Sequence, residues 1–447
     1  GPTRSRLTNL LILLSRPVCK FAHRHFCHGL IWVRTKGGMK IVCPRPQLLA
    51  APGRIAVAML LSSITLKNIL SLKDARLELQ PLNVLIGPNA SGKSNLLDAV
   101  GLLQAAPVDL NSAILRGGGV RCWLWKGNGP SRGAPVASLE CCVKYDARST
   151  PLLYRLVFSE APGGFVIQEE RFQDAASGRR AKQPRVYFDR RVGQVTLGNS
   201  AGDKERVGQV LPSESVLARL KSPMDPTPIT RLGREFERIG LYKEFNTGPL
   251  APARTGVSTS IRKDMLRDGG DNLAVVLNEM EYQGSLARVN EYLNRFCDNF
   301  AEVKIRIEGP TAQAYVREKG LAEPILASRL SDGTLKFLCL LVVLFHPEPP
   351  PLICMEQPEL GLHPDALQLV AEVLEEASQH TQLMVTTHSE ALVDALSGKP
   401  EAVVVCERDR DNATVFRRLE KKQLDVWLKR YTLGELWRKG EIGGNRW

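Results

Sequence analysis

The chain has 447 residues, 43% of them hydrophobic, with 60 basic and 47 acidic residues and a formal net charge of +13. This length is sufficient for two or three domains with a sizeable core. Ten basic residues and no acidic residue lie within residues 1–58, which leaves 50 basic against 47 acidic residues in the rest, a net charge of +3. The net charge therefore does not indicate that residues 59–447 bind DNA. No apolar stretch is long enough to predict a membrane span.

Residues 1–58 form a basic leader that we expect to be disordered or non-native. Met59 is followed at once by a strand-like apolar run that begins the recognisable domain. Two alternatives stay open for the leader: a targeting segment, and a metal cluster formed by His23, His25, Cys27 and His28. The ten cysteines of the chain show no C-x-x-C spacing, which predicts free thiols in a reducing, cytoplasmic compartment.

The stretch from residue 82 to 105 has the order strand, glycine loop, helix. Its centre matches G-x-x-x-x-G-K-[ST], in the context that a phosphate-binding loop requires. Lys93 is expected to reach the β- and γ-phosphates of a nucleotide, and the Ser94 hydroxyl to ligate Mg²⁺. The nucleotide-binding residues are predicted to be Gly87, Pro88, Asn89, Ala90, Ser91, Gly92, Lys93, Ser94 and Asn95.

The middle of the chain is predicted to be rich in strands and then in helices. Trp123 and Trp125 are either core residues or a stacking platform for a base, with the core favoured. Short alternating runs over residues 136–198 predict an antiparallel meander. A polar loop with a short helix is expected at 199–225, a helical region at 226–300, and strands at 303–307 and 312–316.

Three polar groups in the last third of the chain follow or precede apolar elements. Glu356 comes directly after an apolar strand at 352–355, and His388 comes shortly after another at 382–385. Ser331, Asp332 and Gly333 open an apolar helix. Because ligands of doubly wound sheets bind at the carboxyl ends of the strands, Glu356 and His388 are expected to converge on the phosphate loop. Glu356 would hold Mg²⁺ opposite Ser94.

Four motifs together resemble one family, the ABC-type ATPases of the SMC/RecF/OLD group that are called "AAA family ATPase" proteins. They are GPNASGKSN (87–95), LSDGT (330–334), ICMEQPELGLHP (353–364) and VTTHS (385–389). The resemblance implies an α/β P-loop NTPase head split into residues 59–110 and 321–447, with residues 111–320 as a β-rich and helical insertion. It also implies ATP and Mg²⁺ as cofactors and a homodimer formed through ATP. In that dimer Ser331, Asp332 and Gly333 would contact the ATP of the other subunit, and His388 would be the switch histidine.

Two positions depart from the family pattern. Gln357 stands where relatives usually carry the catalytic glutamate, and an amide can orient water but cannot accept its proton. Slow hydrolysis is therefore expected, with Glu359 as a fallback base. Ile69 and Leu70 stand where relatives often have an aromatic and a basic residue, which leaves the residues that contact adenine unassigned.

Three functions are compatible with these motifs. The first is an ATPase that acts on DNA or on an effector protein, in DNA repair or anti-phage defence. The second is a regulatory module that binds ATP and does not hydrolyse it. The third, an ABC transporter subunit, is disfavoured by the long spacing from Lys93 to Ser331. Glu407, Asp409 and Asp411 are interpreted as a charged surface loop and not as part of a nuclease centre.

Overall fold

The computed structural model describes residues 31–35, 38–42, 59–127, 135–145, 149–175, 184–191, 193–198, 204–220 and 227–444. The chain divides into two compact units, Gly1–Ile55 and Ala56–Trp447. In the first unit, which the sequence predicted to be disordered or non-native, β1 (Ile31–Thr35) and β2 (Gly38–Val42) pair as an antiparallel hairpin. The His23, His25, Cys27 and His28 cluster lies outside the described residues.

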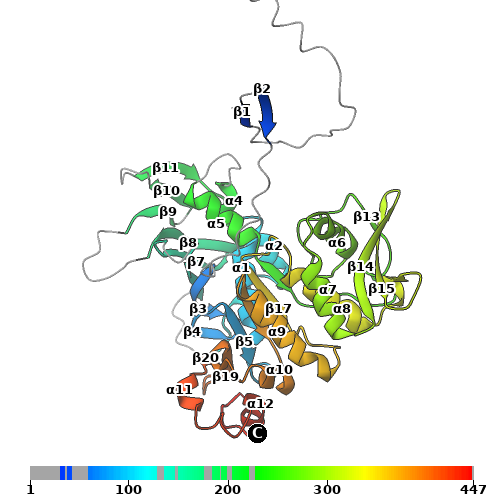
Figure 1. The fold of residues 1–447 in the computed structure, drawn as a ribbon. Coiled ribbons are helices and arrows are strands. Elements are labelled where there is room, and N and C mark those ends of the chain that lie inside the picture. The colour runs from blue at the N-terminus through cyan, green and yellow to red at the C-terminus, as the bar shows by residue number, and fades with distance from the viewer. Residues whose placement is uncertain are drawn as a thin grey trace, which may run out of the picture. The chain divides into compact units, whose positions relative to one another are not determined.

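The second unit is built on a six-stranded sheet with the order β12-β17-β18-β5-β19-β20 (Figure 1). All neighbours are parallel except the last pair. Alternate residues of β5 enter opposite cores, since Val84 and Ile86 belong to one apolar cluster and Leu85 to the other. A strand buried on both faces in this way requires a continuous apolar run, as the sequence has. The strands are β5 (Leu82–Ile86), β12 (Gly240–Tyr242), β17 (Leu352–Glu356), β18 (Gln382–Thr386), β19 (Val403–Arg408) and β20 (Thr414–Arg418).

A second, eight-stranded sheet has the order β11-β10-β9-β8-β7-β6-β3-β4, and all its pairs are antiparallel. This confirms the predicted meander. The polar loop predicted at 199–225 is wrong in part, because β11 pairs with β10 and extends the sheet. The strands are β3 (Leu61–Ile69), β4 (Leu72–Glu78), β6 (Val136–Val143), β7 (Leu152–Ala161), β8 (Gly164–Asp174), β9 (Val186–Arg191), β10 (Gln194–Gly198) and β11 (Lys204–Gln209).

Two apolar cores lie on the two faces of the six-stranded sheet. One combines the eight-stranded sheet with α1 (Lys93–Ala105) and α5 (Pro228–Glu237). The other contains α8 (Asp332–Leu344), α9 (Leu367–Ala377), α10 (Glu390–Ala395) and α12 (Leu433–Arg438). The shorter helices are α2 (Leu110–Arg116), α3 (Val120–Trp123), α4 (Val216–Arg219), α11 (Lys421–Leu424) and the 3₁₀ turns Ala327–Arg329, Pro364–Ala366 and Pro400–Ala402.

The region predicted as helical at 226–300 is helical only in part. Besides α5 it contains α6 (Leu273–Tyr282) and α7 (Ala287–Phe296), but β12 joins the edge of the six-stranded sheet. Three residues are too few to show strand alternation, which is why the sequence did not reveal β12. In Figure 1, α6, α7 and α8 gather beside a small sheet of β13 (Val257–Ser258), β14 (Phe300–Glu308), β15 (Thr311–Glu318) and β16 (Ile325–Leu326).

In the part of the chain that the structure describes, no helix combines the length and the apolar character needed to cross a bilayer.

Candidate functional site

The phosphate loop connects β5 to α1 and can form only with glycine at two positions. Gly87 has a φ of +145° and Gly92 a φ of +102°. A Cβ at Gly87 would lie 2.2 Å from the carbonyl oxygen of Cys406, and one at Gly92 would lie 2.0 Å from Oγ1 of Thr414. Both neighbours come from the far end of the chain, so the tertiary structure closes around a loop that has no room for side chains there.

Lys93 lies at the first position of α1 and is folded back over the loop. Its side chain is 6% exposed, and its Nζ donates to the carbonyl oxygens of Gly87 at 2.7 Å and Pro88 at 2.9 Å. Burial lowers the pKa of Lys93 below its ordinary value. A cation held at a helix N-terminus beside a glycine loop is the arrangement that binds the terminal phosphates of a nucleotide.

Ser94 and Glu356 meet at the carboxyl edge of the sheet, as expected. The hydroxyl of Ser94 donates to Oε1 of Glu356, which ends β17. Mg²⁺ prefers oxygen ligands and usually takes one or two from the protein and the rest from phosphate and water. One hydroxyl and one carboxylate next to the phosphate loop therefore fit this ion.

A cavity of about 350 Å³ lies over the loop and includes other residues that the sequence singled out. Its walls are formed by the loop itself and by Glu356, Gln357, Thr386, His388 and Arg408. Burial, and secondly the charge of Lys93, lower the pKa of His388, so its imidazole is neutral at pH 7. Gln357 has a φ of +47°, and its N–H donates to the carbonyl oxygen of Thr386 at 3.0 Å. A non-glycine residue held at positive φ beside a cavity is a mark of a functional position.

Glu359 lies near this cavity but does not contribute to its wall. Its Oε1 accepts hydrogen bonds from Oγ1 of Thr387 at 2.5 Å and from the N–H of His388 at 3.3 Å. Its Oε2 is buried with no partner among the described residues. Burial raises the pKa of Glu359. In this arrangement Glu359 supports the turn that carries His388, and its role as a base stays a prediction.

Ser331, Asp332 and Gly333 lie elsewhere in the fold. Ser331 caps α8, since its Oγ accepts the N–H of Thr334 at 3.1 Å. Asp332 pairs with Arg254, whose side chain is 6% exposed and also donates to the carbonyl oxygen of Leu330 at 2.6 Å. Residues 331–333 form the signature loop, and the cavity over the phosphate loop is the phosphate cavity. Among the described residues that line the phosphate cavity, none belongs to the signature loop.

Comparison with known families identifies the chain. Residues 159–394 match the family described as "AAA domain, putative AbiEii toxin, Type IV TA system", and this match spans more than half of the chain. The chain belongs to this family. Residues 59–115 also match the family described as "AAA ATPase domain". The comparison with curated proteins gives no match.

Two solved structures show which fold this AAA domain has. A crystal structure of an Smc head bound to the C-terminal winged-helix domain of ScpA has a TM-score of 0.52 and 13% identity, covering 81% of this chain and 99% of that one. The Smc head of Pyrococcus furiosus with an extended coiled coil, bound to the C-terminal domain of ScpA, has a TM-score of 0.50 and 12% identity, covering 83% and 98%. The predicted α/β P-loop fold and the resemblance to SMC/RecF-like AAA ATPases are confirmed, and the chain is an ATP-binding ATPase of this type.

Sequence reasoning missed Ser71 and Thr414, which together with the predicted Asn95 hold the phosphate loop of this AAA domain in place. Thr414 of β20 donates to the carbonyl oxygen of Ser91 at 2.8 Å and lies 2.7 Å from Oγ of Ser71. Asn95 Nδ2 donates to the same Ser71 oxygen at 2.6 Å. These residues are up to 343 positions apart, so no local sequence signal points to them.

Two further cations near the site were also missed. Arg408, at the end of β19, donates from Nε to the carbonyl oxygen of Ala90 at 2.7 Å and lines the phosphate cavity. Lys243 follows the unexpected strand β12 and pairs with Asp98 of α1 at 2.7 Å. The hydrogen bond to Asp98 raises the pKa of Lys243, and the charge of Glu356 adds to this effect. The one sequence signal that could have indicated Arg408 is a basic residue two positions after the apolar run 402–406.

The acidic residues Glu407, Asp409 and Asp411, at the end of β19 and just after it, have structural partners. Glu407 accepts the N–H of Gly444 at 2.9 Å, and Asp409 accepts the N–H groups of Asp411 at 2.9 Å and Ala413 at 2.8 Å. Asp411 pairs with Lys73 at 2.7 Å. Turn formation and surface pairing thus account for all three.

Proposed function

We propose that this AAA ATPase is a switch in which two copies bind ATP between them, hydrolyse it slowly, and act on DNA or on an effector protein. The observation that carries this proposal is the separation of the site into two parts. The phosphate loop, Ser94, Glu356 and His388 share one cavity, while the signature loop of Ser331 lies outside its walls. A second copy related by twofold symmetry would supply the missing part twice, once for each nucleotide.

Within this proposal each residue of the cavity has a definite task. Lys93 would neutralise charge on the terminal phosphates, and Ser94 and Glu356 would hold Mg²⁺, which would supply further charge neutralisation there. His388 lines the same cavity, and its imidazole would offer an N–H donor to the γ-phosphate. The N-terminus of α8 would face the γ-phosphate from the other copy, with the N–H groups of its first turn pointing at the anion.

Slow hydrolysis follows from the chemistry of Gln357. Its amide can orient an attacking water molecule, but it has no basic site for the proton that leaves. Glu359 is directed at Thr387 and at the backbone of His388, so it is a poor replacement. The ATP-bound dimer would therefore persist long enough to act on a partner. The alternative function is a regulatory module that binds ATP and does not hydrolyse it.

The comparisons also bear on the partner of the switch. The family description names a toxin of type IV TA systems, which supports a role in defence. The two solved Smc heads carry a ScpA domain, which supports a protein partner for a head of this fold. Residues 59–447 carry a net charge of only +3, which gives no electrostatic support for DNA binding. We also propose a cytoplasmic location, because the cysteines that the structure describes are free thiols.

Light scattering with and without ATP tests the switch. Lys93→Ala should abolish ATP binding, and Ser331→Arg should leave ATP bound to a monomer. Ser331→Asp is the sharper variant, because aspartate retains the helix cap but places a negative charge against the triphosphate. Ser260→Arg changes another exposed serine and is the control. ATP-dependent dimers of Ser331→Asp would refute the role given to the signature loop.

Binding of duplex DNA at increasing salt distinguishes the two partner classes. A DNA-binding switch should show ATP-dependent affinity that falls steeply with salt. Absence of binding with any nucleotide would assign the switch to a protein effector.

A further inference from the structure

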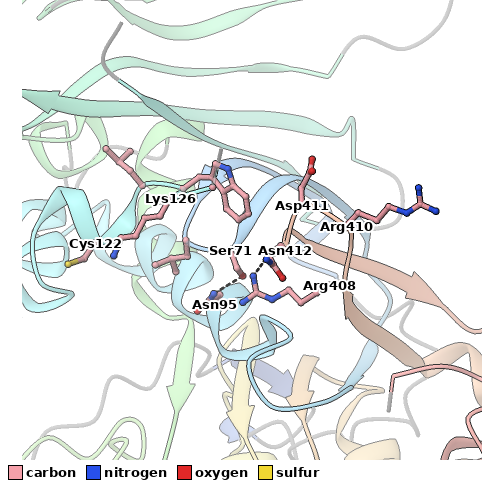
Figure 2. Close-up of a pocket in the computed structure, with 12 residues that line it drawn as sticks. Ser71, Asn95, Cys122, Lys126, Arg408, Arg410, Asp411 and Asn412 are labelled. Carbon is pink, nitrogen blue, oxygen red and sulfur yellow. Dashed lines mark hydrogen bonds between the residues drawn. The ribbon is translucent and has the colours of Figure 1, made fainter. Parts of the chain in front are cut away.

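A second and larger cavity, of about 630 Å³, adjoins the phosphate cavity (Figure 2). The two cavities share Asn95 and Arg408 as walls. In Figure 2, Asn95, Ser71, Arg408 and Asn412 lie close together, with Cys122 and Lys126 to one side of them, while the side chain of Arg410 extends away. The recess over the phosphate loop thus continues past the start of α1.

The direction of a bound nucleotide follows from neighbouring residues of α1. Ser94 faces Glu356 and the phosphate cavity, whereas Asn95 is bonded to Ser71 and borders both cavities. Terminal phosphates placed at Lys93 and Ser94 therefore leave the rest of the nucleotide on the side of Asn95. The larger cavity is the space available to it.

A tryptophan is fixed in the wall of this cavity by the turn between β3 and β4. The N–H of Leu70 donates to the carbonyl oxygen of Trp123 at 2.7 Å, and the N–H of Trp125 donates to that of Asn68 at 3.0 Å. Ile69 and Leu124 pair as an isolated antiparallel β-bridge between these two hydrogen bonds. These contacts hold the segment 123–125 against the end of β3.

The two tryptophans of this segment have different environments. Trp123 is 8% exposed, and its Nε1 donates to the carbonyl oxygen of Ile114 at 3.2 Å, so it is a satisfied core residue. Trp125 lines the cavity, and its buried Nε1 has no partner within the described part of the chain. Of the two tryptophans, Trp125 is therefore the one that a ligand in this cavity would contact.

We propose that the larger cavity binds the base and ribose of the nucleotide, with Trp125 as the stacking residue and with purines preferred over pyrimidines. This inference rests on the nucleotide site of the proposed function. The two fused rings of a purine offer more area for stacking on an indole than the single ring of a pyrimidine does. Lys126 and Arg408 add positive charge beside the ribose and the α-phosphate.

Equilibrium binding of ATP, UTP and inorganic tripolyphosphate tests the proposal. Trp125→Ala should weaken ATP binding tenfold or more, bring ATP and UTP to similar affinities, and leave tripolyphosphate unchanged. Trp427→Ala removes a tryptophan that is 45% exposed on the C-terminal segment and is the control. Equal affinities of the wild type for ATP and tripolyphosphate would overturn the nucleoside pocket. Failure of Lys93→Ala to weaken either ligand would instead overturn the proposed function.

A second measurement uses the unaltered protein and so does not depend on folding of a variant. Cys122 is an exposed free thiol in the cavity wall. ATP should slow its alkylation by a maleimide, read by peptide mass spectrometry, at least fivefold, while saturating tripolyphosphate should not. Equal protection by both ligands, or none by ATP at saturation, would show that the nucleoside lies elsewhere.

Discussion

Replacing Thr414 by valine should loosen the phosphate loop while nearly preserving the shape of the side chain. Thr414 is 1% exposed, and its single hydroxyl proton is donated to the carbonyl oxygen of Ser91. Ser71 must then be the donor in the 2.7 Å contact with Thr414, and it accepts in turn from Asn95. The bonds therefore run in one direction, from Asn95 through Ser71 and Thr414 to Ser91.

The expected loss can be estimated from this chain of bonds. Valine removes two buried hydrogen bonds, each worth about 1 kcal/mol net, so the free energy of unfolding should fall by about 2 kcal/mol. For a unit as large as Ala56–Trp447, with an unfolding entropy of about 2.1 cal/mol/K per residue, this corresponds to a Tm lower by about 2–3 °C. ATP binding should weaken by about tenfold, or 1.4 kcal/mol, because the backbone at Ser91 is no longer held in the phosphate-binding geometry.

Urea denaturation and ATP titration measure the two effects, and Thr381→Val separates them. Thr381 is also 1% exposed, and its hydroxyl donates to the carbonyl oxygen of Pro350 at 2.5 Å, just before β18 and away from the loop. Thr381→Val removes one buried hydrogen bond, so it should lower the free energy of unfolding by about 1 kcal/mol without affecting ATP binding. If both variants weaken ATP equally, or if Thr414→Val leaves its affinity unchanged, Thr414 does not hold the loop as described.

Three further predictions concern the chemistry, the stability and the proposed dimer. Gln357→Glu should raise ATP turnover by about 10²-fold, the usual contribution of a general base, and fast wild-type turnover unchanged by the swap would contradict this. Burial raises the pKa of Glu359 above its ordinary 4.5, so the wild type should lose stability as the pH rises from about 4.5 through the raised value. Glu359→Gln should remove that loss. If the difference in urea midpoint between wild type and Glu359→Gln were the same at both ends of this pH range, Glu359 would not be its cause. Arg254→Met should reduce ATP-dependent dimerisation at least tenfold while monomers still bind ATP, because Leu330 and Asp332 lose their partner; undiminished dimers in light scattering would disprove it.

Much of the site was predictable because its signals are local. The strand β5, the glycine loop and the start of α1 are contiguous, and each needs specific residue types at fixed spacing. The meeting of Ser94 with Glu356, 262 residues later, was also predictable, since parallel strands bring their carboxyl ends to one edge. General rules of sheet topology were sufficient for that contact.

Other parts required the folded chain. The three-residue strand β12 has no pattern of its own and exists because it pairs with β17. Trp125 reaches the larger cavity only because the β3–β4 turn anchors its segment, and in the sequence it was inseparable from the core residue Trp123. Arg254 supports the signature loop through contacts 76 and 78 residues away.

The class of protein and the residues at the terminal phosphates could be predicted from local motifs, because phosphate binding depends on glycine geometry and on charge at a helix N-terminus. How that loop is held, where a nucleoside has space, and the position of the signature loop outside the cavity became visible in the folded chain alone. Those properties depend on contacts between segments far apart in the chain, and such contacts leave no periodicity or spacing in the sequence.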